Sequence, residues 1–442
     1  MPIEGIQLSN FKCFEDSGRV RLAPLTVIFG KNNAGKSSIL NSLLLLRQTL
    51  VAPDLIPRLN IRGTLYSAGD YADIVYQHRA SKNIVFSFSI SGTYRNSEEK
   101  YSAKIELEFA SDEPQPPRLA SVRAYLEESE NVPSLEIRRS RGQGGPYEML
   151  MENHKLGGEL KANFRFAVNR FLPRIGFEPP AVGRPNKHKP EIRRKVRDLF
   201  DELEKSLLNV RAVGAFRQQP GRRYEFQGRV TEGSDASGKD VILSLIEDTT
   251  GRRNRGALLR NVNRYLQSVG KVKLLRPRSI SKQARLFEVR LKDTDSGRWA
   301  NFADVGYGIG QALPVIVEGL RTPQGGTFLV QEPEIHLHPD AQLRMADFLV
   351  DLVKSGKRVI AETHSENLLL RIRHSIVKTT TMVSSGLTPD QVSIVYVDKS
   401  SKGPSKAREL KIDSLGQIDG WPIGFMEEAT TERISLLEDA AR

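Results

Sequence analysis

The sequence contains one cysteine, Cys13, among 442 residues. A single thiol cannot build an internal disulfide framework and is typical of a reducing compartment. No apolar run approaches the roughly 20 residues that a membrane-spanning helix needs. The first residues, MPIEGIQLSNF, also lack the basic and apolar segments of a secretory signal. We therefore predict a cytoplasmic protein that makes no membrane contact.

Heptad repeats and internal repeats are absent as well. The helical pattern over 190–208 has ordinary length and does not continue, so no long coiled-coil arm is expected. The 39% of hydrophobic residues suffice for a substantial core and two or three structural units.

Basic residues are not balanced by acidic ones in the middle of the chain. The net charge is +13, and residues 131–290 hold 34 Lys and Arg against 17 Asp and Glu, whereas the rest is near neutral. Such a basic stretch favours contact with a polyanion such as DNA or RNA, although a basic surface that meets only solvent is the alternative. The clusters are at 138–141, 187–195, 216–226, 252–255 and 271–278.

Short apolar runs alternate with helical patterns, which indicates an α/β fold. An apolar helix is expected directly after the strand at 25–29, and residues 112–118 and 141–146 read as loops. The expected strands are 25–29, 84–90, 104–110, 286–293, 327–331, 357–364 and 393–397.

The stretch GKNNAGKS matches the pattern G-x-x-x-x-G-K-[ST] at every fixed position, between a strand and a helix as the motif requires. Backbone N–H groups of such a loop surround phosphate oxygens at a helix N-terminus. Lys36 would reach the β- and γ-phosphates of ATP, and the Ser37 hydroxyl would bind Mg²⁺. The residues expected to bind ATP are Gly30, Lys31, Asn32, Asn33, Ala34, Gly35, Lys36, Ser37 and Ser38.

Three further features follow in a fixed order. A glycine cluster, NFADVGYGIGQ, precedes the helical pattern 312–320, the strand 327–331 runs into VQEPEIHLHPD, and the strand 357–364 ends in His364. Glycines before a helix can form a second phosphate-facing N-terminus. This order of phosphate loop, glycine signature, Glu-Pro and His resembles that of ABC-type ATPase heads.

Longer segments carry the same resemblance. NFKCFEDSGRVRLAPLTVIFGKNNAGKSS is similar to the start of RecF, SMC and OLD-type ATPases. VGYGIGQALPVIV, QEPEIHLHP and ETHSENLLLRI resemble a subgroup of small bacterial "AAA family" ATPases, and LKIDSLGQIDGWPIGFMEE looks like the C-terminal domain of unknown function of that subgroup. The resemblance implies an ABC-type P-loop ATPase head with an antiparallel β subdomain.

We accordingly divide the chain into three regions. Residues 1–130 would form the N-terminal part of the head, with the P-loop and the β subdomain. Residues 131–290 would be a basic, partly helical insertion. Residues 291–442 would hold the signature, the Walker B strand, the switch histidine and a short tail domain.

The resemblance also implies roles for single residues. ATP would lie between two protomers packed head to tail, in a homodimer or higher oligomer, with the P-loop of one facing the signature of the other. Glu332 would be the general base and His364 would sense the γ-phosphate. The signature that acts in trans would be Gly306, Gly308, Gly310 and Gln311, and the D-loop would be His336, Leu337 and His338. Gln77 would be a Q-loop residue near the metal.

Gln331 stands where the resemblance places the aspartate that orients the Mg²⁺ shell. Its carbonyl can accept a hydrogen bond from a metal-bound water, but it carries no charge. We therefore expect weaker or more Mg²⁺-dependent nucleotide binding and slow hydrolysis, with Glu334 as a partial replacement for the missing charge. A silent substitution in a functioning ATPase and a clamp with negligible turnover both remain open.

Two alternatives concern other chemistry. His336, His338 and His364, with Glu332 and Glu334, could suggest a zinc hydrolase, but that leaves the phosphate loop unexplained. In the cluster 216–226, the aromatic residues Phe216, Tyr224 and Phe226 interleave with Arg217, Arg222 and Arg223, a mixture suited to stacking on single strands. The same segment also resembles a family segment near the nucleotide site.

Only 78 residues follow His364, fewer than the nuclease domain that OLD-type proteins carry. Any destructive activity is therefore expected in a separate effector protein. By resemblance, the preferred function is an ATPase sensor or scaffold in anti-phage defence. A RecF-like DNA-binding ATPase in repair and a nucleotide-binding clamp are the alternatives.

Overall fold

The computed structural model describes most of the chain. The described residues are 3–52, 58–126, 135–139, 147–153, 158–165, 176–177, 189–228, 230, 235–251, 256–270, 272–294, 296–381, 386–399, 403–422, 432, 435–437 and 439.

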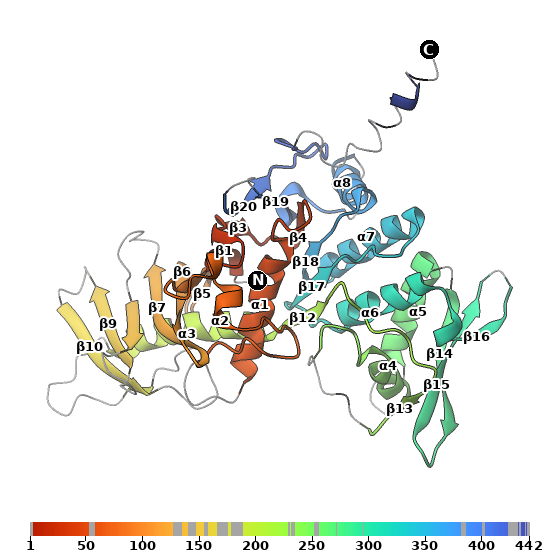
Figure 1. The fold of residues 1–442 in the computed structure, drawn as a ribbon, viewed down its shortest axis with the longest axis horizontal. Coiled ribbons are helices and arrows are strands. Elements are labelled where there is room, and N and C mark those ends of the chain that lie inside the picture. The colour runs from red at the N-terminus through yellow and green to blue at the C-terminus, as the bar shows by residue number, and fades with distance from the viewer. Residues whose placement is uncertain are drawn as a thin grey trace.

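A six-stranded sheet lies at the centre of the molecule, in the order β12-β17-β18-β4-β19-β20 (Figure 1). Its first five strands are parallel, and β20 runs antiparallel to β19. The uninterrupted apolar runs of β4, β17 and β18 suit strands that are covered on both faces. The strands are β12 (Val210–Val213), β17 (Thr327–Gln331), β18 (Arg358–Glu362), β4 (Leu25–Gly30), β19 (Val392–Lys399) and β20 (Ser405–Leu410).

An antiparallel sheet of ten strands forms the arm coloured red to yellow in Figure 1, in the order β11-β10-β9-β8-β7-β6-β5-β1-β2 with β3 beside β1. The alternating patterns at 84–90 and 104–110 correspond to β5 and β6. The strands are β1 (Ile3–Phe11), β2 (Phe14–Asp16), β3 (Val20–Arg21), β5 (Ile84–Thr93), β6 (Lys100–Asp112), β7 (Gln115–Leu126), β8 (Leu135–Arg139), β9 (Tyr147–Asn153), β10 (Gly158–Arg165) and β11 (Gly176–Phe177).

The prediction of a loop over 112–118 is wrong. Strand β7 begins at Gln115, and only a tight turn separates it from β6. Pro116 and Pro117 lie at the beginning of this strand, where a missing backbone N–H is tolerated. The loop expected over 141–146 lies outside the described residues.

A third sheet, in the order β13-β15-β14 with β16 beside β15, forms a separate lobe with two helices. The expected strand 286–293 is β15. The elements are β13 (Tyr224–Glu225), β14 (Val272–Ser281), β15 (Leu286–Asp293), β16 (Trp299–Asn301), α4 (Val241–Thr250) and α5 (Ala257–Gly270). The basic stretch 131–290 thus contributes strands to all three sheets.

Two hydrophobic cores lie on opposite faces of the central sheet, because side chains alternate along each strand. Leu329 and Ile360 join the core that contains α1, α3 and the ten-stranded sheet. Phe328 and Val359 join the other core, with α5, α6, α7 and α8. The remaining helices are α1 (Lys36–Val51), α2 (Tyr71–Ile74), α3 (Lys189–Leu208), α6 (Tyr307–Arg321), α7 (Pro339–Lys354) and α8 (Glu366–Thr381), with 3₁₀ turns at Tyr76–His78, Phe302–Asp304 and Pro389–Gln391.

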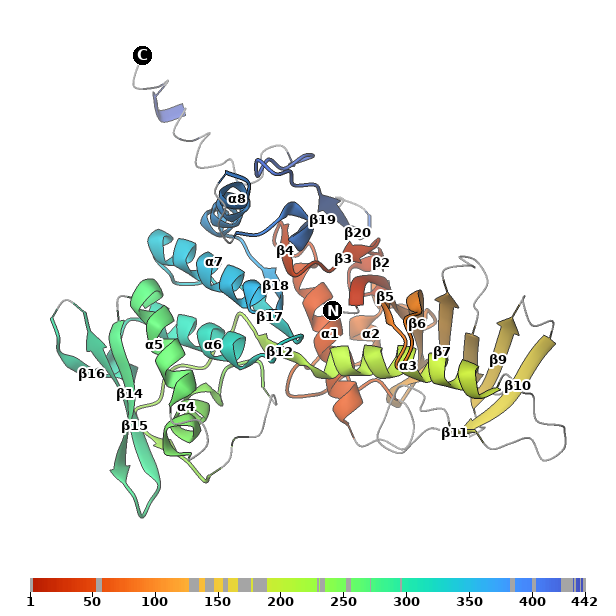
Figure 2. The same ribbon diagram turned by 180° about the vertical axis from the view of Figure 1, so that it is seen from behind.

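Helix α3, expected over 190–208, lies along the ten-stranded sheet (Figure 2). With 20 residues it is the longest helix in the described part of the chain, which contains no long coiled-coil arm. None of the helices described is both long and apolar enough to cross a bilayer. The predicted α/β fold with an antiparallel β subdomain is confirmed.

Candidate nucleotide site

Three neighbouring parallel strands end at one edge of the central sheet. Gln331, the last residue of β17, is paired with Glu362, the last residue of β18. Glu362 is paired in turn with Ile28 of β4, whose last residue, Gly30, opens the phosphate loop. The strand order therefore brings the phosphate loop, Gln331 and Glu362 together, as expected at the carboxyl ends of parallel strands.

The phosphate loop packs tightly against the start of the ten-stranded sheet. Gly35 has φ +108°, and a Cβ atom there would lie 2.1 Å from the Sγ of Cys13. That thiol donates to the carbonyl of Ala34 over 3.5 Å. Helix α1 begins at the next residue, Lys36, so this glycine is required both for the turn and for the close approach.

Lys36 lies inside the loop and is only 4% exposed. Its Nζ donates to the carbonyls of Gly30 and Lys31 at 2.9 and 3.0 Å. Burial lowers the pKa of this amine, while the charges of Glu362 and Glu332 raise it. The ammonium group is thus held where the loop would meet a phosphate chain.

Glu362 is a site residue that the sequence analysis missed. The Ser37 hydroxyl donates to its Oε1 at 2.7 Å, and the Gln331 amide donates to its Oε2 at 3.1 Å. The residue is 4% exposed, and burial raises its pKa against the opposing effects of Ser37 and Lys36. The strand expected over 357–364 ends at Glu362, two residues before the predicted end at His364, so the sequence analysis did not place this acid at the strand end.

Glu334, which the sequence suggested as a partial replacement for the charge missing at Gln331, is buried beside His364. Its Oε1 accepts a hydrogen bond from the backbone N–H of His364 at 2.7 Å, and burial raises its pKa. The His364 side chain itself is exposed, and partial desolvation followed by the charge of Lys36 lowers its pKa. Glu334 therefore fixes the backbone that carries His364.

Glu332 occupies a strained position directly after β17. Its φ is +46°, and its N–H donates to the carbonyl of Glu362 at 2.7 Å. This side chain is half-buried. The left-handed backbone turns the chain sharply away from the strand at the residue expected to be the general base.

Arg217 is a second residue that the sequence analysis interpreted differently. It is 7% exposed, and burial lowers its pKa to about 10, so it stays charged at neutral pH. It donates to the backbone carbonyls of Gly214, Gln311, Gln331 and Glu332 at 3.0, 2.9, 2.7 and 2.8 Å. Arg217 thus ties helix α6 to the end of β17 and is not part of a stacking surface.

The helix expected over 312–320 begins earlier, at Tyr307, and Gly306 is its N-cap. The later glycines of the signature therefore lie within α6. A Cβ atom on Gly308 would lie 2.7 Å from the carbonyl oxygen of His336, whereas one on Gly306 would meet no atom within 4 Å. The rings of Tyr307 and His336 pack edge to face with centroids 4.7 Å apart. The signature and the D-loop therefore form one face.

Not every predicted signature and D-loop residue lies on that face. Gly310 and Gln311 are buried, and Gln311 accepts from Arg217 through its carbonyl. His338 caps α7, with its Nδ1 accepting from the N–H of Asp340 at 3.3 Å. The exposed residues are Gly306, Tyr307 and His336, together with His338 at the start of α7.

The zinc-hydrolase alternative finds no support in the geometry. Within the part of the chain that the structure describes, no group of three or more His, Cys, Asp or Glu side chains could hold a metal ion. Gln77, the possible Q-loop residue, has φ +56° and donates to the Tyr76 hydroxyl at 3.2 Å. Its place near the metal stays a prediction.

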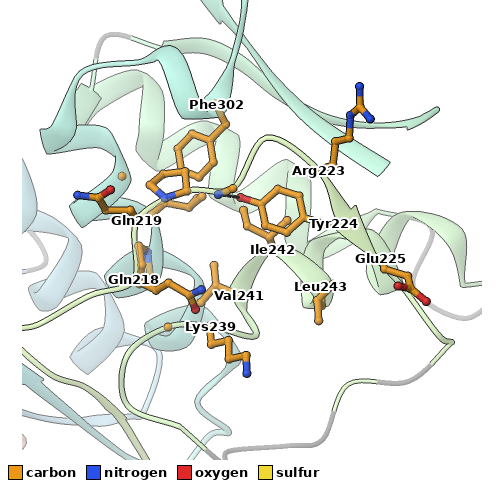
Figure 3. Close-up of a pocket in the computed structure, with 16 residues that line it drawn as sticks. Gln218, Gln219, Arg223, Tyr224, Glu225, Lys239, Val241, Ile242, Leu243 and Phe302 are labelled. Carbon is orange, nitrogen blue, oxygen red and sulfur yellow. Dashed lines mark hydrogen bonds between the residues drawn. The ribbon is translucent and has the colours of Figure 1, made fainter. Parts of the chain in front are cut away.

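A cavity of about 280 Å³ lies on the side of α6 away from the D-loop (Figure 3). Phe302 and Tyr224 flank it, and the Tyr224 hydroxyl accepts from the N–H of Gly221 at 2.7 Å. The segment after Arg217 forms one wall, with Gln218, Gln219, Pro220 and Arg223, and the start of α4 forms another, with Val241, Ile242 and Leu243. Within the cluster 216–226, Arg217 and Phe226 are buried, whereas Arg222 and Arg223 are exposed and Phe216 is 94% exposed.

The remaining basic clusters are described only in part. The side chains of 138–141 and the residues 252–255 lie outside the described part, as do 187 and 188. In the third sheet, Arg276 of β14 is directly opposite Arg290 of β15, and Lys292 is opposite Trp299 of β16. Like charges placed opposite each other repel. On the same face Arg278 pairs with Glu288 at 3.6 Å, so basic side chains outnumber acidic ones there, and we call it the basic sheet face.

A family model of an AAA domain, described as putative AbiEii toxin, Type IV TA system, matches residues 25–371. A second model, a protein of unknown function called DUF3696, matches residues 387–435. The curated protein "OLD nuclease" of Thermus scotoductus is 23% identical over 377 residues, which is 82% of this chain and 59% of that protein. The chain therefore spans less than two thirds of the length of this relative.

Solved structures of SMC heads are also similar at low identity. An SMC head bound to the C-winged helix domain of ScpA gives a TM-score of 0.44 at 12% identity, covering 92% of this chain and 97% of that one. The SMC head domain from Thermotoga maritima gives 0.41 at 10% identity, covering 93% and 100%.

Proposed function

We propose that this chain, which belongs to the AAA-domain family described as putative AbiEii toxin, binds and slowly hydrolyses ATP between two copies packed head to tail. It is an ABC-type ATPase of the RecF, SMC and OLD class with a C-terminal DUF3696 region. The observation that carries the proposal is the meeting of Lys36, Ser37 and Glu332 at one edge of the central sheet.

The residues at this edge suit a nucleotide with Mg²⁺. Lys36 would bind the β- and γ-phosphates, and the Ser37 hydroxyl is an oxygen donor of the kind that Mg²⁺ takes. The ion would neutralise the charge that develops on the transferred phosphoryl group. Glu332 would accept a proton from the attacking water, and His364, held by Glu334, would contact the γ-phosphate.

The face formed by the signature and the D-loop supports pairing of two copies. Its outermost residues, Gly306, Tyr307 and His336, are exposed. Among the described residues, no hydrogen bond joins this face to the phosphate loop of its own chain. A second copy would bring its phosphate loop to this face and complete two sites at once.

The test is steady-state ATP hydrolysis by purified protein at saturating Mg²⁺, over a range of protein concentrations. We expect slow turnover whose rate per chain rises with protein concentration, because the complete site needs two copies. Glu332→Gln should lower the rate by about 10²- to 10⁴-fold and still bind ATP. Equal turnover by Glu332→Gln and the wild type would reject the assignment of the base.

The biological setting is a further part of the proposal. We place the ATPase in bacterial anti-phage defence, as a nucleotide-gated sensor that recruits a separate effector protein. The family description names a toxin of toxin–antitoxin systems, and the relative from Thermus scotoductus is called a nuclease. Plating of phages on cells with the native locus should give protection that is lost on Glu332→Gln substitution. Undiminished protection by that variant would contradict the nucleotide-gated role.

The basic sheet face favours a second candidate function, binding of single-stranded nucleic acid. Arg276, Arg290 and Lys292 form no ion pair with any described residue, and Trp299 beside them is 37% exposed. Cationic groups around an aromatic ring suit phosphates and a stacked base. This function corresponds to the RecF-like alternative and is compatible with ATP hydrolysis.

Fluorescence anisotropy of a labelled oligothymidylate measures this binding. The double variant Arg276→Gln/Arg290→Gln should bind more weakly, and its slope of log affinity against log salt should be less steep by about 1.4, as expected for two lost phosphate contacts. Lys399→Gln/Lys406→Gln, on exposed positions of β19 and β20, is the control of equal charge. Equal weakening by both double variants would indicate only a general charge effect.

A further inference from the structure

The acid of the nucleotide site stands on a different strand from the one where the family resemblance places it. β17 ends in an amide, Gln331, and β18 ends in a carboxylate, Glu362. β18 lies between β17 and β4 in the sheet. Glu362 is therefore one strand nearer to the phosphate loop than Gln331 is.

The contacts of Glu362 fit a retained carboxylate. A buried carboxylate is costly unless its oxygens have partners. Here the Ser37 hydroxyl donates to one oxygen at 2.7 Å and the Gln331 amide to the other at 3.1 Å.

We propose that Glu362 supplies the negative charge of the Mg²⁺ shell and that Gln331 holds this carboxylate in place. The proposal rests on the ATP site proposed above. Ser37 and Glu362, the hydroxyl and the carboxylate that would face the ion, are already in contact. Both are the hard oxygen donors that Mg²⁺ prefers.

This assignment explains why the residue at 331 is not an acid. A carboxylate at position 331 would face Glu362 across the register pair, and two ionised carboxylates in contact repel each other. An amide can donate instead, as Gln331 does. In this assignment the negative charge of the site is on β18, at Glu362, and the Gln331 amide donates a hydrogen bond to it.

The experiment measures binding of a fluorescent, non-hydrolysable ATP analogue to the full chain, in EDTA and in saturating Mg²⁺. The ratio of the two affinities is the metal enhancement. Glu362→Gln should lower this enhancement by about 10- to 100-fold, as loss of a group that supports a metal does. Its affinity in EDTA should change little, because the change preserves shape and leaves Lys36 in place. Glu366→Gln, at an exposed position of α8, is the matched control.

Two further variants keep the proposal testable if Glu362→Gln does not fold, which circular dichroism checks. Gln331→Leu removes the amide but keeps the charge at 362, so its metal enhancement should stay well above that of Glu362→Gln. Gln331→Asp/Glu362→Gln returns the acid to β17 and should recover part of the enhancement. A Gln331→Leu enhancement as low as that of Ser37→Ala would assign the metal shell to Gln331 and overturn the proposal.

The possible outcomes separate this proposal from the ATP site itself. If Glu362→Gln matches the wild type while Ser37→Ala loses the enhancement, the site stands and the role of Glu362 is wrong. If the wild type binds the analogue in neither condition, the ATP site fails and this proposal fails with it. Loss of the enhancement in Glu362→Gln and not in Glu366→Gln supports the proposal.

Discussion

The two halves of the candidate nucleotide site are built in opposite ways. The phosphate loop is packed from within, with Lys36 buried against carbonyls of its own loop and Gly35 pressed on Cys13. The signature face is open, and Gly306 has nothing within 4 Å of a built Cβ. The phosphate loop is therefore preformed in a single chain, whereas the signature face is open at Gly306.

Arg217 links the signature helix α6 to the end of β17, and its loss should have the largest effect. Arg217→Met leaves four backbone carbonyls without this donor, two of them at Gln331 and Glu332. We expect the free energy of unfolding to fall by about 3 kcal/mol, since charged hydrogen bonds contribute about 1.5–3 kcal/mol each and the lost ones overlap. Urea denaturation measures this change.

Arg222→Gln is the matched control for Arg217, because Arg222 is exposed in the same segment and pairs with Asp304. A surface ion pair contributes at most about 1 kcal/mol, so this variant should be nearly as stable as the wild type. Equal stability of Arg217→Met and Arg222→Gln would mean that Arg217 does not hold α6 to the end of β17.

Lys36→Ala breaks the preformed half alone. We expect ATP affinity to fall by about 10- to 100-fold, because a charged hydrogen bond contributes about 1.5–3 kcal/mol. Calorimetric titration with ATP measures the loss. Lys31→Ala, on an exposed neighbour in the same loop, should bind ATP more nearly as the wild type does. A larger loss for Lys31→Ala would contradict the placement of the phosphates beside Lys36.

Gly308→Ala tests the contact between the signature and the D-loop. The added methyl group would lie 2.7 Å from the His336 carbonyl, so the two segments must separate. Crowding of this kind costs about 1 kcal/mol or more, and the melting temperature should fall. Gly306→Ala, which meets open space, should melt as the wild type does. If both variants melt alike, the signature does not rest on the D-loop.

The phosphate loop was predictable because its residues are contiguous and their spacing carries the chemistry. Glu362 was not recognised, because its role depends on a sheet order that places β18 between β17 and β4. A single sequence shows which strands exist but not which are neighbours. Glu334, the neighbouring acid along the chain, accepts a hydrogen bond from the backbone N–H of His364, which the sequence does not indicate.

The cluster 216–226 shows a different limit. Alternating basic and aromatic residues are compatible with a surface for nucleic acid and equally with a buried brace. Phe226 is 8% exposed and Arg217 7%, whereas Phe216 is 94% exposed. Composition cannot separate these environments, because both charged and aromatic side chains can be buried once every polar group finds a partner.

The register pair of Gln331 and Glu362 limits the order in which its two residues could have been exchanged during evolution. Suppose that an ancestor had an acid at 331 and none at 362. If the acid at 362 appeared first, the intermediate had two facing acids, and if the acid at 331 was lost first, the intermediate had none. The first intermediate keeps a charge if one acid stays protonated, whereas the second has lost it. An exchange through the double acid would therefore be the easier route. Related proteins with acids at both positions would be evidence for it.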